Sequence, residues 1–280
     1  MSRKVEKERE GLSDAEIGHS LLEKFADIEF GKYVLVPGDP GRVSVMASQW
    51  DEATEVEFPR GYRGAVGVYK GAKISALSHG IGGPSLEHVL TEMAALGAHT
   101  FIRVGTTGAL QEGIFNGDLI IDEASVRMDG TSNLYVRNEF PAAASYEVTL
   151  ALVQACEIHG LPYHVGIGAT TASFYRGQGR SSFGGYKPSG TDEIFTDMQM
   201  AGVLNFEMEA ATLLTLARLF RVRAGMIASV IAQRVTGIWD DAGGVERGCL
   251  AGAEAIRLLT EWDEKKAKAG KKFFFPSLLS

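Results

Sequence analysis

Short β-rich runs alternate with longer helical patterns along most of this 280-residue sequence, and this alternation limits the folds that the chain can adopt. Strands are predicted in the runs YVLVPG, GAVGVYKGAKISALSHG, TFIRVGTTGAL, GDLIIDEASV, YHVGIGATTASF and AGMIASVIAQR. Apolar residues spaced three and four apart predict helices over residues 85–98, 149–160, 206–221 and 244–269. We therefore predict an α/β fold in which helices flank a central β-sheet, and a hairpin at Lys70-Gly71 makes that sheet mixed.

The sequence contains no linker, change of composition or internal repeat that would divide it into two domains. We predict a polar N-terminal extension over residues 1–18, one domain over residues 19–263, and a C-terminal extension over residues 264–280 that is first basic and then apolar. Its last residues, FFFPSLLS, would dock on the chain's own surface or on a neighbouring subunit, although loose apolar tails also occur. Both ends are therefore interpreted as additions to a single core.

The composition excludes several classes of function. A formal net charge of -7 argues against broad binding to nucleic acid, which requires an excess of basic residues. No apolar run approaches the roughly 18 residues needed to cross a bilayer, so no membrane role is expected. Cys156 and Cys249 stand in unrelated contexts, so neither a disulfide framework nor a cysteine metal site is predicted. Because no targeting segment is visible at the N-terminus, we expect a soluble protein of the reducing cytoplasm.

Glycines, hydroxyls and arginines follow several of the predicted strands, which is where ligands bind in α/β folds. One strand ends in a turn over residues 38–41 that is followed by Arg42, and another contains Arg103 and continues into Gly-Thr-Thr-Gly at 105–108. Taken alone, each glycine run could simply permit a tight turn, and Arg103 could form a structural salt bridge. Taken together, two arginines with hydroxyls and free backbone N–H groups are typical of a phosphate site.

A second constellation lies in the run FYRGQGR, which is predicted to form a loop. The amide of Gln178 offers a donor and an acceptor in one plane, so it can pair with the edge of a flat heterocycle. Arg180 could bind a further carbonyl of that heterocycle, and Phe174 offers a stacking face. The alternative is an ordinary surface loop with a buried phenylalanine.

Two carboxylates, Glu207 and Glu209, flank Met208 where an apolar helix is predicted to begin. Such residues often only complement the helix dipole. A carboxylate this close to the core needs hydroxyl or amide partners, and the hydroxyls of a sugar are suitable ones. A metal site is disfavoured because no His or Asp lies at helical ligand spacing.

The three constellations together resemble the nucleoside phosphorylase family, and within it the branch that acts on uridine. The resemblance covers about residues 19–262 and rests on VPGDPGRV, GIGGPS, RVGTTGAL, ASVRMDG, FYRGQGR, NFEMEAATLLT and AGMIASVIAQR, in the order and spacing of the family. It implies the single-domain fold of that family over residues 19–263, with a central mixed sheet flanked by helices.

The resemblance also implies a role for each matching residue. Phosphate would be bound by Gly38, Arg42, Arg103 and Thr106, together with Arg60 of a neighbouring subunit, for which Arg63 is a competing candidate. Ribose would be bound by Thr106, Met208, Glu209 and Glu207, together with His19 of the neighbouring subunit. The base would be bound by Thr107, Gly108, Phe174, Gln178, Arg180, Ile231 and Arg234.

The activity implied is the reversible phosphorolysis of uridine to uracil and α-ribose 1-phosphate in pyrimidine salvage. Phosphate is a co-substrate and no cofactor or metal is expected; a potassium site is disfavoured because Gly61 stands where relatives often carry a glutamate. A shared site implies at least a dimer, and the family commonly forms hexamers. Purine enzymes of the superfamily use an aspartate after the last apolar strand, where this chain has Gln233 and Arg234. The alternatives are a purine or broad-specificity phosphorylase, a hydrolytic nucleosidase, and a nucleoside-binding protein without turnover.

Overall fold

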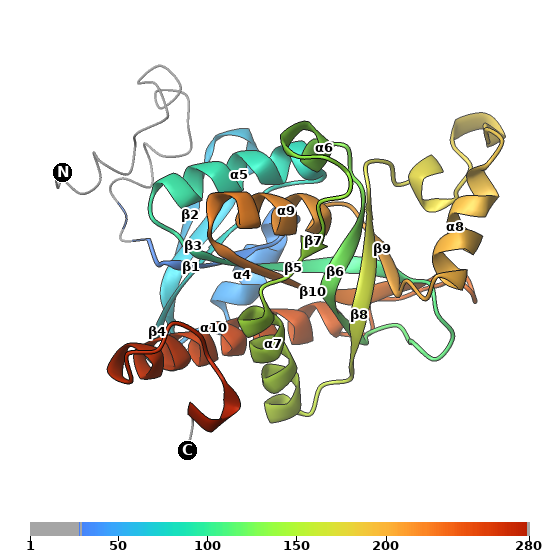
Figure 1. Ribbon diagram of the computed structural model, residues 1–280. Coiled ribbons are helices and arrows are strands. Elements are labelled where there is room, and N and C mark those ends of the chain that lie inside the picture. Colours follow the sequence, from blue (N-terminus) through green and yellow to red (C-terminus); the bar gives the residue numbers. More distant parts are fainter. Residues whose placement is uncertain (1–27, 29, 279–280) are drawn as a thin grey trace.

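One mixed β-sheet runs through the computed structural model, which describes residue 28 and residues 30–278 (Figure 1). Its strands are β1 (Tyr33–Val36), β2 (Glu52–Glu57), β3 (Arg63–Tyr69), β4 (Ala72–Leu77), β5 (Thr100–Ala109), β6 (Leu119–Met128), β7 (Ala142–Ala143), β8 (Tyr163–Thr171), β9 (Asn205–Glu207), β10 (Arg223–Gln233) and β11 (Ile238–Trp239). The α-helices are α4 (Pro40–Ala47), α5 (Gly83–Ala95), α6 (Thr131–Tyr135), α7 (Tyr146–His159), α8 (Thr191–Met200), α9 (Ala210–Phe220) and α10 (Gly244–Lys268). Short 3-10 turns cover Pro59–Gly61, Arg176–Gln178, Phe183–Gly185 and Pro276–Leu278.

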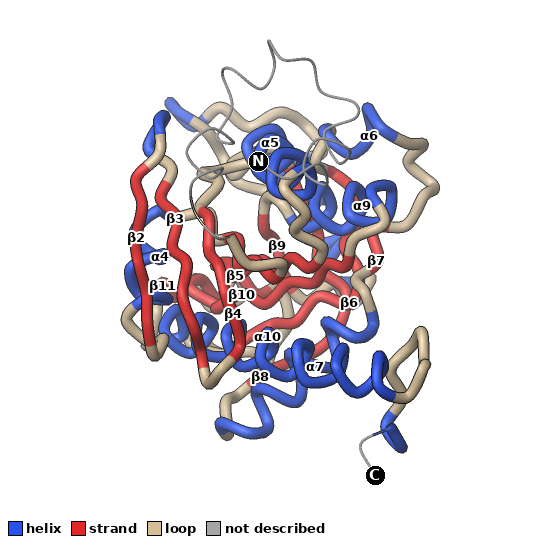
Figure 2. Tube along the Cα trace, turned by 90° about the vertical axis from the view of Figure 1, so that its left-hand side faces the viewer, coloured by secondary structure: helices blue, strands red, loops and turns tan. Residues whose placement is uncertain are grey.

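Part of the sheet closes on itself. The strand order is β11-β10-β6-β8-β9-β5-β1-β4-β3-β2, and β10 also pairs with β5, so that β10, β6, β8, β9 and β5 form a ring. Beyond β5 the sheet continues as an open wing of four strands, which is seen on the left of Figure 2. Strand β5 pairs in parallel with both β1 and β10, whereas β3 pairs with both of its neighbours in antiparallel fashion. The predicted mixed sheet is therefore confirmed.

Helices cover both faces of the sheet, with α5 and α9 on one side and α7 and α10 on the other (Figures 1 and 2). The central strands are consequently buried on both faces, which explains their continuous apolar runs. In β1, Val34 packs in the core under α5 and α9, whereas the next residue, Leu35, packs in the core under α10. Phe101 and Ile102 of β5 divide in the same way. The sheet is thus the partition between two hydrophobic cores.

The sequence predicted most strands and long helices correctly, including the hairpin between β3 and β4. Its turn residues, Lys70 and Gly71, have φ of 47° and 80°, the left-handed conformations that a two-residue hairpin turn requires. The largest error at the start of a predicted helix is that of α9. The helix predicted to begin at residue 206 begins at Ala210, because Asn205–Glu207 form strand β9.

A turn was predicted over residues 38–41, but these residues lead into a helix, because α4 begins at Pro40. Asp39 is the N-cap, and its Oδ1 accepts a hydrogen bond from the N–H of Gly41 at 2.8 Å. Pro40 occupies the first helical position, where its missing N–H has no cost. As a result Arg42 lies in the first turn of a helix. The sequence analysis also missed β2, α6 and α8, which are short or polar.

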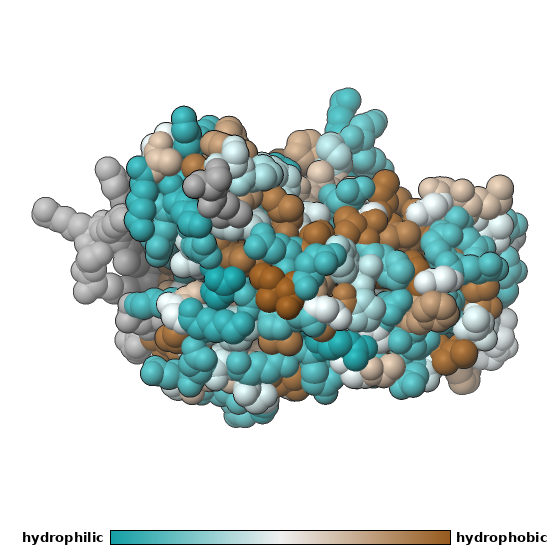
Figure 3. All heavy atoms as spheres, turned by 90° about the horizontal axis from the view of Figure 1, so that it is seen from below, coloured by the Kyte–Doolittle hydropathy of each residue, from teal (hydrophilic) through white to brown (hydrophobic). Residues whose placement is uncertain are grey.

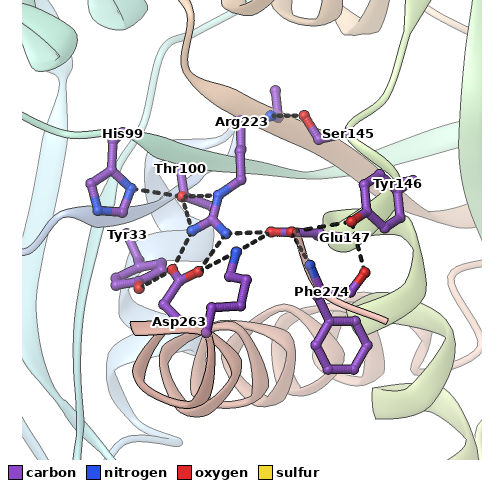
Figure 4. A network of polar contacts seen from close by, with 11 residues as sticks. Tyr33, His99, Thr100, Ser145, Tyr146, Glu147, Arg223, Asp263 and Phe274 are labelled. Atoms are coloured by element: carbon purple, nitrogen blue, oxygen red, sulfur yellow. Dashed lines mark hydrogen bonds and ion pairs between the residues drawn. The ribbon is translucent and has the colours of Figure 1, made fainter. Parts of the chain in front are cut away.

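The C-terminal tail packs on the body of the same chain. Phe274 stacks on Trp262 of α10 with ring centroids 4.0 Å apart, and its N–H donates to Oε1 of Glu147 at 3.0 Å. Glu147 in turn accepts from Arg223 Nη1 at 2.8 Å and from Lys266 Nζ at 2.7 Å, and this network links α7, β10 and α10 (Figure 4). Buried ion pairs and one apolar side chain therefore fix the tail.

The face of the molecule shown in Figure 3 is mostly hydrophilic, with separate small apolar areas. No helix within the described part of the chain is long and apolar enough to span a membrane.

Candidate functional site

A pocket of about 720 Å³ collects the ends of several strands and the loops that follow them. These are the segments after β1, β4 and β8, the ends of β5 and β10, the β9–α9 junction and β11. The residues predicted for a site that line this pocket are Gly38, Arg42, Arg103, Thr106, Thr107, Gly108, Phe174, Gln178, Arg180, Glu207, Met208, Glu209 and Ile231. Residues from seven sequence segments thus meet in one cavity, as expected where strand ends share an edge of the sheet.

Four further residues of the sequence analysis do not line the pocket. Arg234 lies behind it, where Nη2 donates to the backbone oxygen of Gln178 at 2.8 Å. Arg60 is exposed on the 3-10 turn before β3, with φ of 63°. Arg63 binds Glu57 through Nη2 at 3.2 Å. His19 lies outside the described residues.

Arg42 is a buried cation without a carboxylate partner among the residues that the structure describes. Its side chain is 7% exposed, and Nη1 donates to the backbone oxygen of Val104 at 2.8 Å. Its Nε is buried and has no hydrogen-bond partner. Burial lowers the pKa of Arg42 below its ordinary value, and the charge of Arg103 lowers it further. A cation held in this way favours an anionic ligand.

Arg103 lines the pocket and also forms buried ion pairs, which is the structural alternative that the sequence left open. Its Nε lies 3.0 Å from Oε2 of Glu207, and Nη2 lies 2.5 Å from Oε2 of Glu209. The third group, Nη1, lies 3.2 Å from Nε2 of His79. Burial, followed by the charge of Arg103, lowers the pKa of His79 well below its usual range, so this imidazole is neutral and Nε2 accepts from Arg103.

The two glutamates are not equivalent. Glu207 accepts hydrogen bonds from the N–H groups of Glu209, at 2.8 Å, and Ala210, at 2.9 Å, and from the hydroxyl of Thr170. Its carboxylate therefore satisfies the first N–H groups of α9, whose N-cap residue is Glu209, and these bonds also explain why that helix begins late. Glu209 accepts from Gly82 N–H and contacts Arg103. Burial raises the pKa of Glu209, so hydroxyl donors from a ligand would stabilise its ionised form.

The loop that contains the run FYRGQGR, residues 174–180, presents unpaired polar groups to the pocket. Gln178 is 4% exposed and ends a 3-10 turn, and its backbone oxygen is held by Arg234. No other described residue hydrogen-bonds the side-chain amide of Gln178 or the guanidinium of Arg180, although both line the cavity. The donors and acceptor of these two groups are therefore free to bind a ligand.

The sequence analysis missed other lining residues: Asp39, Pro40, Gly80, Ile81, Phe206, Ala232 and Trp239. Asp39, Pro40, Phe206 and Ala232 lie beside residues that were predicted, and Gly80 and Ile81 belong to the GIGGPS motif. Trp239 is the exception, because it follows a Thr-Gly turn after β10 and lies 53% exposed at the pocket wall. Its only signal in the sequence was a large aromatic residue in a polar loop.

Within the described ranges, no group of three or more His, Cys, Asp or Glu residues is arranged to hold a metal ion. Cys156 and Cys249 are both buried and free. The polar groups of the cavity include three arginines, Arg42, Arg103 and Arg180, together with the carboxylate of Glu209 and the amide of Gln178, and aromatic rings line it as well.

Comparisons with known proteins agree with this chemistry. A sequence model of the phosphorylase superfamily matches residues 32–266. The uridine phosphorylase of Thermococcus kodakarensis is 53% identical over 250 residues, which cover 89% of this chain and 90% of that protein. The uridine phosphorylase of Escherichia coli is 39% identical over 80% of this chain and 88% of that protein. A guanosine phosphorylase of Halorubrum lacusprofundi is 34% identical over 78% of this chain and 84% of that protein.

Proposed function

The chain belongs to the phosphorylase superfamily, and we propose that it is a pentosyltransferase that converts uridine and phosphate reversibly into uracil and α-ribose 1-phosphate in pyrimidine salvage. The observation that carries this proposal is the single pocket in which Arg42 and Arg103, the carboxylate of Glu209 and the free amide of Gln178 meet. These groups match an anion, a sugar and a flat heterocycle respectively.

In the proposal, phosphate binds between Arg42 and Arg103, with the hydroxyl of Thr106 as a further partner. Gly38 lets the backbone approach this anion, and its own surroundings are tight: a Cβ at this position would lie 2.9 Å from the backbone oxygen of Gly80. The uncompensated charge of Arg42 supports this assignment, because a bound phosphate would neutralise it.

Ribose then lies beside Met208, with Glu209 accepting from its hydroxyls and Thr106 near both substrates. Glu207 supports the site indirectly, since its oxygens are used by backbone N–H groups, Thr170 and Arg103. The geometry therefore favours Glu209 as the carboxylate that touches the sugar.

Uracil is assigned to Gln178 and Arg180, next to Phe174. The walls of this subsite are Thr107, Gly108 and Ile231, and Arg234 fixes the backbone of Gln178. Gln233 and Arg234 stand in the region where purine enzymes of the superfamily use an aspartate. The amide of Gln233 is used internally, since Nε2 donates to the backbone oxygens of Gln111 and Ile114, both at 2.9 Å. No acid is therefore presented there to protonate a purine, which supports a pyrimidine substrate.

The reaction follows from these positions. A phosphate oxygen forms a bond to C1′ of ribose while the bond from C1′ to N1 of uracil breaks, which inverts the configuration. Uracil leaves with the electron pair, its negative charge spreads onto its oxygens, and it then takes up a proton. N–H donors of Gln178 and Arg180 stabilise that developing charge, and fixed donors of this kind are worth about 3 kcal/mol each in enzyme sites. Phosphate is the co-substrate, and the proposed reaction invokes no cofactor.

The decisive experiment follows uracil release from uridine with and without phosphate, and tests inosine and thymidine in parallel. We expect release only with phosphate, together with ribose 1-phosphate in equal amount. Release without phosphate would indicate a nucleosidase. Preference for inosine would indicate a purine phosphorylase like the guanosine-specific relative, and no release from any nucleoside would indicate a binding protein.

We further propose that Arg60 and His19 complete the site from a neighbouring subunit, which makes a dimer the smallest active unit and a hexamer the larger assembly. Arg60 is exposed and outside its own pocket, as such a role requires. Gly61 provides no carboxylate for a potassium ion beside it. The two free cysteines are consistent with a cytoplasmic location.

Hybrid dimers test the shared site. Arg60→Ala and Arg42→Ala variants should each be nearly inactive, but their coexpression should restore activity, because one site of every hybrid contains both arginines. Coexpression of Arg63→Ala with Arg42→Ala tests in the same way whether Arg63 is the arginine that acts across subunits. Activity equal to the sum of the two separate variants would show that Arg60 does not act across subunits.

A further inference from the structure

Arg180 lies in a corner between two aromatic rings. Its guanidinium carbon is 4.8 Å from the ring centroid of Phe174 and 4.9 Å from that of Trp239. The two centroids are 6.3 Å apart and the rings are inclined at 55°, so they meet at an angle around the cation instead of lying on opposite sides of it. Both ring faces therefore attract the same positive charge.

These rings are the groups that hold the guanidinium in place. Within the described chain Arg180 has no ion pair, and its Nε is buried without a hydrogen-bond partner. A neighbouring cation, Arg234, has its pKa lowered to about 10 by burial and by repulsion from Arg180. A charge that is desolvated and repelled by a neighbour needs compensation, and the negative ring faces supply it.

Backbone pairing determines where Trp239 lies. Strand β11 pairs antiparallel with the end of β10, which places Trp239 opposite Ala232. The intervening turn is fixed by Gln233, whose Oε1 accepts from Val235 N–H at 2.7 Å. An indole that remains 53% exposed contributes little to the hydrophobic core, so its contact with Arg180 is its clearest role.

We propose that Trp239 is a positioning residue that directs the N–H groups of Arg180 toward the base, and that it sets uridine affinity through Arg180 alone. This inference rests on the proposed function. Because Phe174 is there assigned to stack with the base, Trp239 is the ring left to orient the guanidinium.

Steady-state kinetics of Trp239→Ala, Trp239→Phe and Ile238→Ala test the inference. Trp239→Ala should raise KM for uridine about tenfold and change kcat less than threefold or so, while KM for phosphate stays constant. Trp239→Phe keeps a ring face and should restore most of the affinity. Ile238→Ala is the matched control, because this exposed side chain precedes Trp239 in the same strand and is absent from the pocket wall.

A double variant distinguishes a Trp239 that positions Arg180 from a Trp239 that contacts the substrate directly. In an Arg180→Ala background, Trp239→Ala should have no further effect. The inference would be overturned if Trp239→Ala raised KM for uridine tenfold in the Arg180→Ala background as well. It would also be overturned if Trp239→Ala alone raised KM for uridine and KM for phosphate equally. Tryptophan fluorescence of the ligand-free protein adds a readout that needs no turnover: Arg180→Ala should change the emission, and Trp239→Phe should abolish that change. If unmodified protein cleaves no uridine, the proposed function fails, whereas an unchanged emission refutes the pairing of Trp239 with Arg180.

Discussion

Replacing Arg103 by alanine should lower kcat/KM for phosphorolysis by about 10³-fold, because one guanidinium serves both the phosphate and the sugar carboxylate. The same change should destabilise the fold by about 3–5 kcal/mol, since it leaves Glu207 and Glu209 buried together without their cation. Steady-state kinetics and denaturant unfolding measure the two effects separately.

The loss of stability in Arg103→Ala should depend on pH in a defined direction. Burial already raises the pKa of Glu209, and removing the opposing charge of Arg103 raises it further. A carboxyl whose folded pKa lies above its unfolded value is penalised as pH rises from about 4.5 through the folded pKa. The decrease in the free energy of unfolding caused by Arg103→Ala should therefore be smaller at pH 5.5 than at about pH 8.

Arg218→Ala is the control for this variant. Its guanidinium donates to the backbone oxygens of Ala143, at 3.3 Å, and Ala144, at 2.7 Å, and is absent from the main pocket. It should leave kcat/KM unchanged. A stable Arg103→Ala variant with normal phosphate dependence would contradict the buried ion-pair network and the phosphate site together.

Predicted residues that follow buried strands converge on the pocket in the structure. Gly38 comes directly after β1, and Thr106, Thr107 and Gly108 belong to the end of β5. These strands run parallel, so their C-terminal ends share one edge, and polar residues placed there must converge. In this part of the chain, the polar residues that follow the apolar strands and the parallel arrangement of those strands both point to the same cavity.

The features that sequence reasoning missed depend on contacts over long distances. Trp239 reaches the pocket only because a turn after β10 fixes the register of β11. His79 could not be assigned a role, since nothing in its sequence surroundings places it against Arg103. The late start of α9 reflects hydrogen bonds of the Glu207 side chain, which override the apolar periodicity. Arg60 is a different case, because its proposed role requires a second subunit.

Replacing Gln178 by alanine should raise KM for uridine about 30-fold, while KM for phosphate stays within about twofold. The amide is buried and faces the pocket, and no described side chain binds it. Its removal therefore leaves the fold intact but costs two hydrogen bonds to the base, together about 2 kcal/mol. Uridine and phosphate titrations, each at saturating concentration of the other, measure this difference.

Two further variants make the assignment of Gln178 specific. Gln178→Glu keeps the shape but replaces the amide donor with a negative charge beside a leaving group that becomes negative, so it should lower kcat as well as affinity. Gln49→Ala is the control, because that amide donates to the backbone oxygen of Glu246 at 3.0 Å, away from the pocket. Equal losses of uridine and phosphate affinity in Gln178→Ala would show a general disturbance of the cavity, whereas a loss confined to uridine requires the amide to read the base.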